Sequence, residues 1–206
     1  WQAKVSAEVY EYPELAAIIE DKCNTCHTPM GRTEAIFNGA EGYSFTDAMN
    51  DPLSMDGVSC TACHQIQPDN FGTPESFSGA YEIKELKELY GPYQNPNTGP
   101  MAAFTGFTPV YSGHVQQSEL CATCHTLYTP FIDNEGAIAG YFPEQTPYLE
   151  WKNSDFHTDN TSCQDCHMVT HEVSTKISSR PGFIGPRTPI YGHEFLGANV
   201  FMTKIL

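Results

Sequence analysis

All eight cysteines of the 206-residue chain lie in one repeated pattern, in which two cysteines separated by two residues are followed at once by a histidine. No cysteine lies outside this pattern. A shuffled chain of this composition would contain one copy by accident with a chance of roughly one in a hundred, so four copies indicate a shared chemistry. The four motifs, numbered 1 to 4 in chain order, are Cys23, Cys26 and His27; Cys60, Cys63 and His64; Cys121, Cys124 and His125; and Cys163, Cys166 and His167.

This spacing is typical of covalent haem attachment. Two thiols three positions apart reach the two vinyl groups of one porphyrin, and the imidazole of the next residue becomes the proximal ligand of the iron. Zinc binding would require the cysteine pairs to combine into four-ligand sites, and it gives no reason for a histidine after each second cysteine. A disulfide framework explains the histidines less well still. We therefore expect four covalently attached haem c groups and, because this attachment follows export, a location outside the cytoplasm.

The remaining histidines match the expected irons in number, four to four. We expect each of them to be the second, distal ligand of an iron, which would make all four haems bis-histidine and low-spin. Methionine is the competing ligand, but Met30 and Met168 lie too close in sequence to a motif to reach the far face of that motif's own iron. The expected distal ligands are His114, His157, His171 and His193.

The distal histidines are expected to cross between motifs. His171 follows His167 by four residues, so if that turn is helical it faces a neighbouring haem, with haem 3 as the first choice. His114 precedes Cys121 by seven residues and is expected to serve haem 1 or haem 2. Residues 1–26 contain no histidine, so haem 1 must find its distal ligand far along the chain or on another chain. If a ligand comes from another chain, His157 is the expected donor, whereas ligation of a haem in its own subunit is the reading favoured for this residue taken by itself.

Several short elements are expected to hold the motifs. A helix started by proline is predicted over residues 13–26, and a second helix over residues 80–90 with Gly91 at its C-cap. Ser118 is predicted to cap a short helix carrying motif 3, and Thr146 with Pro147 to open another. Residues 129–142 read as a hairpin turning at 134–136, whereas residues 65–79 and 91–113 read as loop.

Composition completes the expected fold class. The chain holds 16 Gly, 15 Pro, 11 Tyr and 12 Phe, which predicts a mostly loop structure with a few short α-helices and a small β-hairpin, packed around four covalent haems. We expect one domain over residues 1–206, in which the porphyrins replace much of the aliphatic core. The charge of −15 argues against nucleic acid as a partner. No apolar run predicts a transmembrane segment, and Trp1 begins no recognisable signal peptide, so the chain reads as mature.

The segments DGVSCTACHQI, SELCATCHTLYTP, EQTPYLEW, TSCQDCHM and HEFLGAN resemble the multihaem cytochrome c554-type superfamily over roughly residues 56–200. The chain is most similar to the tetrahaem extracellular cytochromes that polymerise into conductive filaments, the OmcE-like nanowires. The resemblance implies the cysteines as thioether anchors, the histidines as axial ligands, and haems alternating between stacked and T-shaped pairs. It also implies identical subunits in a head-to-tail homopolymer, outside the cell or on its surface, that exchanges electrons with other redox proteins or extracellular acceptors.

Electron transfer without catalysis is therefore the expected function. A reductase of a small nitrogen or sulfur species would need one iron with an open position, and the matching histidine count argues against that. A monomeric periplasmic electron shuttle shares all the haem chemistry and differs only in assembly. Both remain alternatives at this stage.

Overall fold

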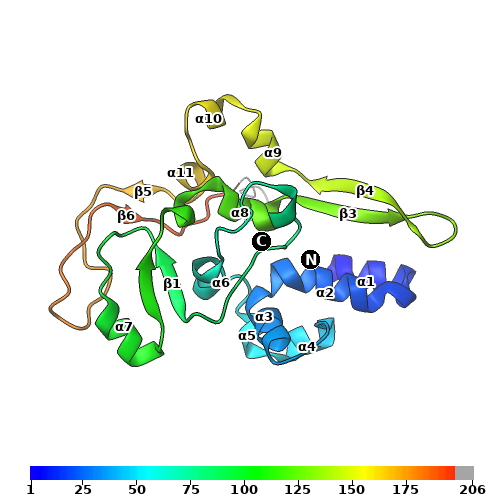
Figure 1. Ribbon diagram of the computed structural model, residues 1–206, viewed down its shortest axis with the longest axis horizontal. Coiled ribbons are helices and arrows are strands. Elements are labelled where there is room, and N and C mark those ends of the chain that lie inside the picture. Colours follow the sequence, from blue (N-terminus) through cyan, green and yellow to red (C-terminus); the bar gives the residue numbers. More distant parts are fainter. Residues whose placement is uncertain (198–206) are drawn as a thin grey trace, which may run out of the picture.

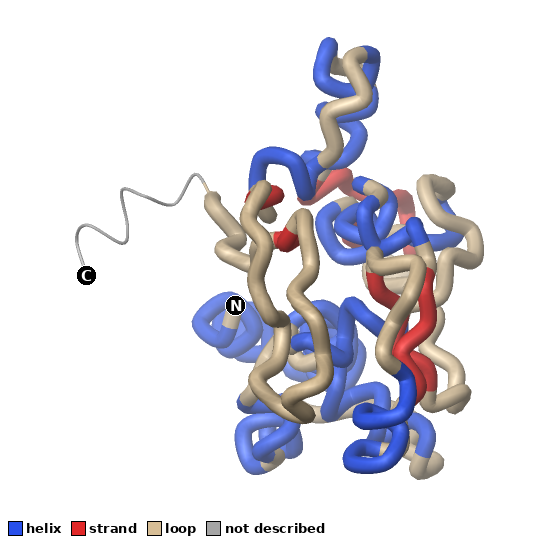
Figure 2. The backbone as a smooth tube through the Cα atoms, turned by 90° about the vertical axis from the view of Figure 1, so that its left-hand side faces the viewer, coloured by secondary structure: helices blue, strands red, loops and turns tan. Residues whose placement is uncertain are grey.

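The computed structural model describes residues 1–197. It consists of short helices, three two-stranded sheets and long loops (Figure 1). The same distribution is visible from the side in Figure 2, where loop accounts for much of the path between helices. Among the described residues, no helix is long and apolar enough to cross a membrane.

A helical layer forms the first part of the chain. Proline at the first position of α3 and a capping box between Ser44 and Asp47 in front of α4 define two of the helix starts. The helix expected over residues 13–26 is present as a 3₁₀ turn (Pro13–Leu15) followed by α2, whereas α1 was not predicted. The helices of this layer are α1 (Gln2–Glu11), α2 (Ala16–His27), α3 (Pro29–Phe37), α4 (Phe45–Asn50) and α5 (Pro52–Met55).

The middle of the chain departs most from expectation. The helix predicted over residues 80–90 is wrong: Ile83 forms an isolated antiparallel bridge with Ile66, and Lys87 has a left-handed φ of 52°. Strand β1 starts directly afterwards and pairs in parallel with β2, so long-range pairing overrides the local helical period. The elements here are α6 (Cys60–Gln65), a 3₁₀ turn (Pro74–Ser76), β1 (Glu88–Gly91), α7 (Thr98–Thr105), β2 (Thr108–Tyr111), a 3₁₀ turn (Gly113–Gln116) and α8 (Ser118–His125).

The prediction of a loop over residues 91–113 and the prediction of a hairpin over residues 129–142 have opposite outcomes. Residues 91–113 are not all loop, because α7 and β2 lie within them and α7 ends at Gly106, whose φ of 76° is left-handed. The hairpin is confirmed and is longer than predicted, with Gly136 in its turn at φ 84°. The helix at Thr146 and Pro147 is also confirmed, as α9. The last elements are β3 (Leu127–Ile132), β4 (Ile138–Gln145), α9 (Pro147–Lys152), α10 (Asp155–Thr158), α11 (Cys163–His167), β5 (Thr170–His171) and β6 (Ile190–Tyr191).

The polypeptide core is small. Its main cluster consists of Phe77, Ala122 and Tyr148, with Leu149 and Trp151 packed at its edge. The chain exposes 13080 Å², compared with roughly 9,600 Å² for a compact chain of this mass. The exposed surface includes many large apolar side chains. Protein packing alone therefore leaves much apolar surface in contact with solvent.

Candidate functional site

Each of the four motifs forms one turn of helix. Helices α2, α8 and α11 end at the histidines of motifs 1, 3 and 4, and α6 contains motif 2. In an α-helix, positions i, i+3 and i+4 share one face, so the two thiols and the imidazole of a motif lie on the same side of their helix. No disulfide joins any two of the eight cysteines.

Motifs 1 and 3 are in contact. The thiol of Cys124 lowers the pKa of Cys26, and the same contact, together with burial, raises the pKa of Cys124. The join depends on Gly79, whose N–H donates to the Thr123 carbonyl at 2.7 Å. A Cβ on Gly79 would lie 2.5 Å from the Thr25 methyl group, and its φ of 79° is left-handed. A glycine therefore allows the chain to pass between the two motif helices.

Motif 4 packs against the other end of motif 3. The Cys121 thiol lowers the pKa of Cys163, while contact with Cys163 and burial raise the pKa of Cys121. The backbone N–H of Cys163 donates to Ser118 Oγ at 2.9 Å. The predicted capping role of Ser118 is therefore wrong, because Gln117 occupies the N-cap position of α8 and the Ser118 hydroxyl binds α11 instead. This hydrogen bond fixes α11 to the start of α8.

Motif 2 approaches motif 3 as well. Burial raises the pKa of Cys63 to about 11, and the neighbouring Cys124 raises it further. Cys63 also acts on Cys121 in the same direction. Motif 3 thus contacts motif 1 through Cys124 and motif 4 through Cys121, and Cys63 of motif 2 lies within electrostatic range of both of its thiols.

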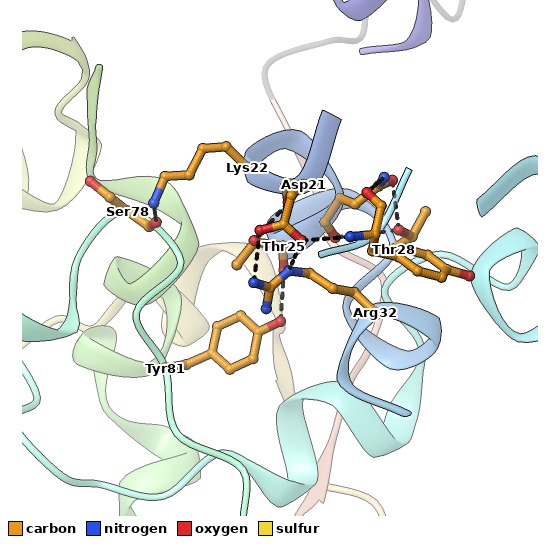
Figure 3. Close-up of polar contacts among 9 residues, drawn as sticks. Asp21, Lys22, Thr25, Thr28, Arg32, Ser78 and Tyr81 are labelled. Carbon is orange, nitrogen blue, oxygen red and sulfur yellow. Dashed lines mark hydrogen bonds and ion pairs between the residues drawn. The ribbon is translucent and has the colours of Figure 1, made fainter. Parts of the chain in front are cut away.

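A polar network clamps the helix of motif 1 (Figure 3). The Arg32 guanidinium donates two hydrogen bonds to the Asp21 carboxylate, both at 2.9 Å. Asp21 also accepts from the backbone N–H of Tyr43 at 3.0 Å. The Thr25 carbonyl accepts from the Tyr81 hydroxyl at 2.7 Å. Because bidentate pairing fixes both direction and distance, α2 is held against α3 and against the loops that follow.

Two motif histidines have the support that metal-binding histidines usually have. The Nδ1–H of His64 donates to the Tyr90 carbonyl, and that of His167 donates to the Leu196 carbonyl. Such bonds fix the tautomer and leave Nε2 as the ligating atom. His27 instead stacks on Trp1, with ring centroids 5.1 Å apart and planes 7° from parallel. Burial lowers the pKa of His27 and of His125, which favours the neutral, ligating imidazole.

His193 lies opposite His64. Their ring centroids are 6.1 Å apart and their planes differ by 32°. An imidazole nitrogen binds a metal at about 2 Å and lies about 1.1 Å from its ring centroid, so two imidazoles on opposite sides of one iron have centroids about 6.2 Å apart. The pair therefore has the spacing of two axial ligands, an assignment that the sequence left open.

His114 is close to the same motif but is engaged otherwise. Its ring is 5 % exposed, its Nε2–H donates to the Ile66 carbonyl at 2.9 Å, and its Nδ1 accepts from Ser112 Oγ at 2.6 Å. Burial lowers its pKa. This bond places His114 next to motif 2, since Ile66 directly follows α6. Ligation through Nε2 would require this side chain to release the Ile66 carbonyl.

The other two distal candidates lie farther out. His171 is not on a helix with His167, because α11 ends at His167 and His171 lies in β5, so the condition for its predicted geometry is not met. Its Nε2 pairs with Glu194 at 2.7 Å. His157 is exposed on α10 and packs edge-on against Trp151, with centroids 4.8 Å apart.

Sequence reasoning missed the partners of these histidines. Tyr90 and Leu196 act through backbone carbonyls, so their side-chain types give no signal. Glu194 could have been noticed, because it is the only acid in the segment 173–197 and lies between His193 and the chain end. The stacking of Trp1 on His27 has no pattern in the sequence that would reveal it.

The arrangement fits haem better than a bare metal ion. Among residues 1–197, no group of three His, Cys, Asp or Glu side chains converges as a structural zinc site requires. A haem iron takes only two ligands from the protein, and the ring centroids of His64 and His193 have the separation that two such ligands require. No family model matches the chain, and no curated protein or solved structure is significantly similar to it.

Proposed function

We propose that this chain is an electron-transfer protein that carries four covalent c-type haems and has no catalytic site. One observation supports this proposal above all others, namely that all eight cysteines occur in haem-attachment motifs which the fold brings together around motif 3. A disulfide or zinc protein gives no reason for the histidine that directly follows each cysteine pair. The resemblance to multihaem cytochromes agrees with the proposal.

Four groups of residues would bind and orient the haems. The cysteine pairs anchor the porphyrins, and the motif histidines bind the irons on the proximal side. The Tyr90 and Leu196 carbonyls orient two of these imidazoles. His193 closes the distal side above motif 2, and the other three non-motif histidines are proposed for the remaining irons. The bound haems supply a reversible one-electron couple.

The contacts between motifs favour conduction over storage on isolated centres. Because thioether bonds form at the porphyrin edge, motifs whose anchor cysteines touch hold their haem edges close together. Motif 3 joins motif 1 through Cys26 and Cys124, and motif 4 through Cys121 and Cys163. A reductase would instead require an iron with an open position and a substrate pocket.

Haem content and spin state test the proposal. The exported protein should contain four haems per chain in a pyridine haemochrome assay combined with intact mass spectrometry, none of them extractable with acid acetone. Electron paramagnetic resonance of the oxidised protein should show no high-spin ferric signal near g of about 6. Fewer than four haems would contradict the attachment proposal. A high-spin signal that shifts with nitrite or hydroxylamine would favour the reductase.

We further propose that identical subunits assemble head to tail at the cell surface or outside the cell, with His157 as an axial ligand given to the neighbouring subunit. Its exposure on α10, at the outer edge of the molecule in Figure 1, supports this role. His157→Ala should lose its filaments in negative-stain images or gain one high-spin haem in electron paramagnetic resonance. The control Thr158→Ala, at the exposed neighbouring position, should do neither. Filaments that persist in His157→Ala with every haem low-spin would contradict the assignment. A native protein that stays monomeric at high concentration would favour the periplasmic shuttle.

A further inference from the structure

Two hairpins of opposite charge project from opposite ends of the molecule (Figure 1). The acidic arm, residues 127–145, consists of β3, its turn and β4, and it contains three acids and no base. The basic loop, residues 173–189, connects β5 to β6 and contains three bases and no acid. In a chain with 25 acids and only 10 bases, this separation concentrates positive charge at one end.

The acidic arm is not covered by the rest of the chain. Residues 129–139 are all exposed, and three aromatic side chains, Phe131, Tyr141 and Phe142, are 51 %, 62 % and 60 % exposed. An isolated two-stranded hairpin is marginally stable in water, and its two outer edges offer unpaired backbone groups. In the described part of the chain, only its base is held by the body, where Glu144 forms an ion pair with Lys4 of α1, and Tyr128 donates its N–H to Ser78 Oγ at 3.0 Å and packs against the core cluster. An arm of this kind gains stability when a partner covers it.

The basic loop is a second hairpin that is exposed over most of its length, with Ile184 buried and Pro189 accepting a hydrogen bond from the Tyr93 hydroxyl at 3.0 Å. Thr175 and Arg187 form a bridge that closes it, and Ile177 and Phe183 are 54 % and 76 % exposed. None of its three bases forms an ion pair within the part of the chain that the structure describes. Arg187 is held over the Tyr93 ring at 5.1 Å. The loop thus presents apolar side chains and unneutralised positive charge together.

We propose that the acidic arm of one copy docks on the basic loop of the next copy. The two surfaces are complementary in charge, both carry exposed apolar side chains, and they lie at opposite ends of the long axis of the molecule. A contact between two different surfaces of identical subunits does not close on itself and therefore generates an open chain. This inference rests on the proposed homopolymer and supplies the surfaces that would build it. The arm edges and apolar side chains would provide affinity, and the charges would provide orientation.

Charge reversal in the holoprotein tests the contact. The loop variant Lys176→Glu/Arg180→Glu has two acidic ends, and the arm variant Asp133→Lys/Glu135→Lys has two basic ends. Each alone should associate at least tenfold more weakly than the native protein in sedimentation velocity. An equimolar mixture should recover assembly, because each reversed end meets a complementary end. The control Lys87→Glu/Lys152→Glu makes the same charge change as the loop variant at positions outside both hairpins, and it should assemble nearly as the native protein does.

Several results would overturn the inference. These are native protein that stays monomeric, either reversed variant assembling as the native protein does, a mixture that fails to recover, or assembly unaffected by raising the salt concentration to about 0.5 M. Haem content is measured on every sample. Four low-spin haems in a protein that fails these tests would remove the docking surfaces and leave electron transfer standing, whereas missing haems would remove the proposed function itself.

Discussion

Removing the His193 imidazole should leave one of the four haem irons without its distal ligand. The centroids of His64 and His193 are 6.1 Å apart, so an iron midway between them lies about 3 Å from each centroid, as two metal–nitrogen bonds of about 2 Å require. In His193→Gly the imidazole of His114, which hydrogen-bonds next to motif 2, remains held by the Ile66 carbonyl at 2.9 Å. We therefore expect about one quarter of the haem iron to become high-spin, with no loss of covalent haem.

Electron paramagnetic resonance and magnetic circular dichroism of the oxidised protein measure this fraction. Added imidazole should bind the open iron and restore the low-spin spectrum. His193→Met should instead keep the iron six-coordinate and raise the reduction potential of one haem only, because thioether ligation raises the potential relative to imidazole. The other three haems act as internal references in the same redox titration.

A second background identifies which haem is affected. Cys60→Ser/Cys63→Ser removes the attachment of haem 2, so adding His193→Gly to that chain should create no further high-spin iron. His171→Gly is the matched control, because its imidazole pairs with Glu194 and is expected to serve haem 3, so its removal should open an iron in either background. A new high-spin signal from His193→Gly in the chain without haem 2 would refute the pairing of His193 with His64.

Two further outcomes concern the helical layer that supports motif 1. Gly31→Ala should destabilise the protein by about 1–3 kcal/mol in thermal unfolding, because a Cβ there would lie 1.9 Å from Ser54 Oγ and 2.3 Å from Asp51 Oδ2. In the control Gly99→Ala, no atom lies within 4 Å of the added Cβ, so the free energy of unfolding should be unchanged or rise by about 0.5–1 kcal/mol. Equal effects of the two substitutions would contradict the steric argument. Burial opposes ionisation of Asp51, but hydrogen bonds from Tyr43 and Ser54 outweigh it and lower its pKa. The carboxylate therefore stabilises the fold above the unfolded pKa of about 4, and this stabilisation is lost as the pH falls through the lower, folded pKa. The melting-temperature difference between the native protein and Asp51→Asn should thus shrink below about pH 3, and a difference unchanged down to about pH 2 would refute the reasoning.

The elements that sequence predicted are those with local causes. Proline at the first helical position fixed the starts of the helices after residues 12 and 146, and the turn around Gly136 fixed the hairpin. The false helix over residues 80–90 has the right period, but its last residues pair with Thr108–Tyr111, about twenty positions away. No pattern within the window could have shown that competing partner.

The same division holds for the candidate site. The motif residues could be read from spacing alone, because attachment requires them to be adjacent. The pairing of His64 with His193 joins positions 129 residues apart and depends on how the loop after β6 returns to α6. The engagement of both nitrogens of His114 is equally a product of tertiary packing. Counting histidines gave the number of possible ligands but not their partners.

The passage of Gly79 between α2 and α8 also constrains the order of folding. Its N–H donates to the Thr123 carbonyl and the N–H of Ser78 donates to the Thr126 carbonyl, so these bonds close loops of 44 and 48 residues. Contacts this distant in sequence form late, because the entropy of closing the loop must be overcome first. Helices α1 to α5 depend on neighbours along the chain and can form earlier. In native-state hydrogen exchange, the amides of Ser78 and Gly79 should therefore open as one cooperative unit with the end of α8, separately from the N-terminal helices.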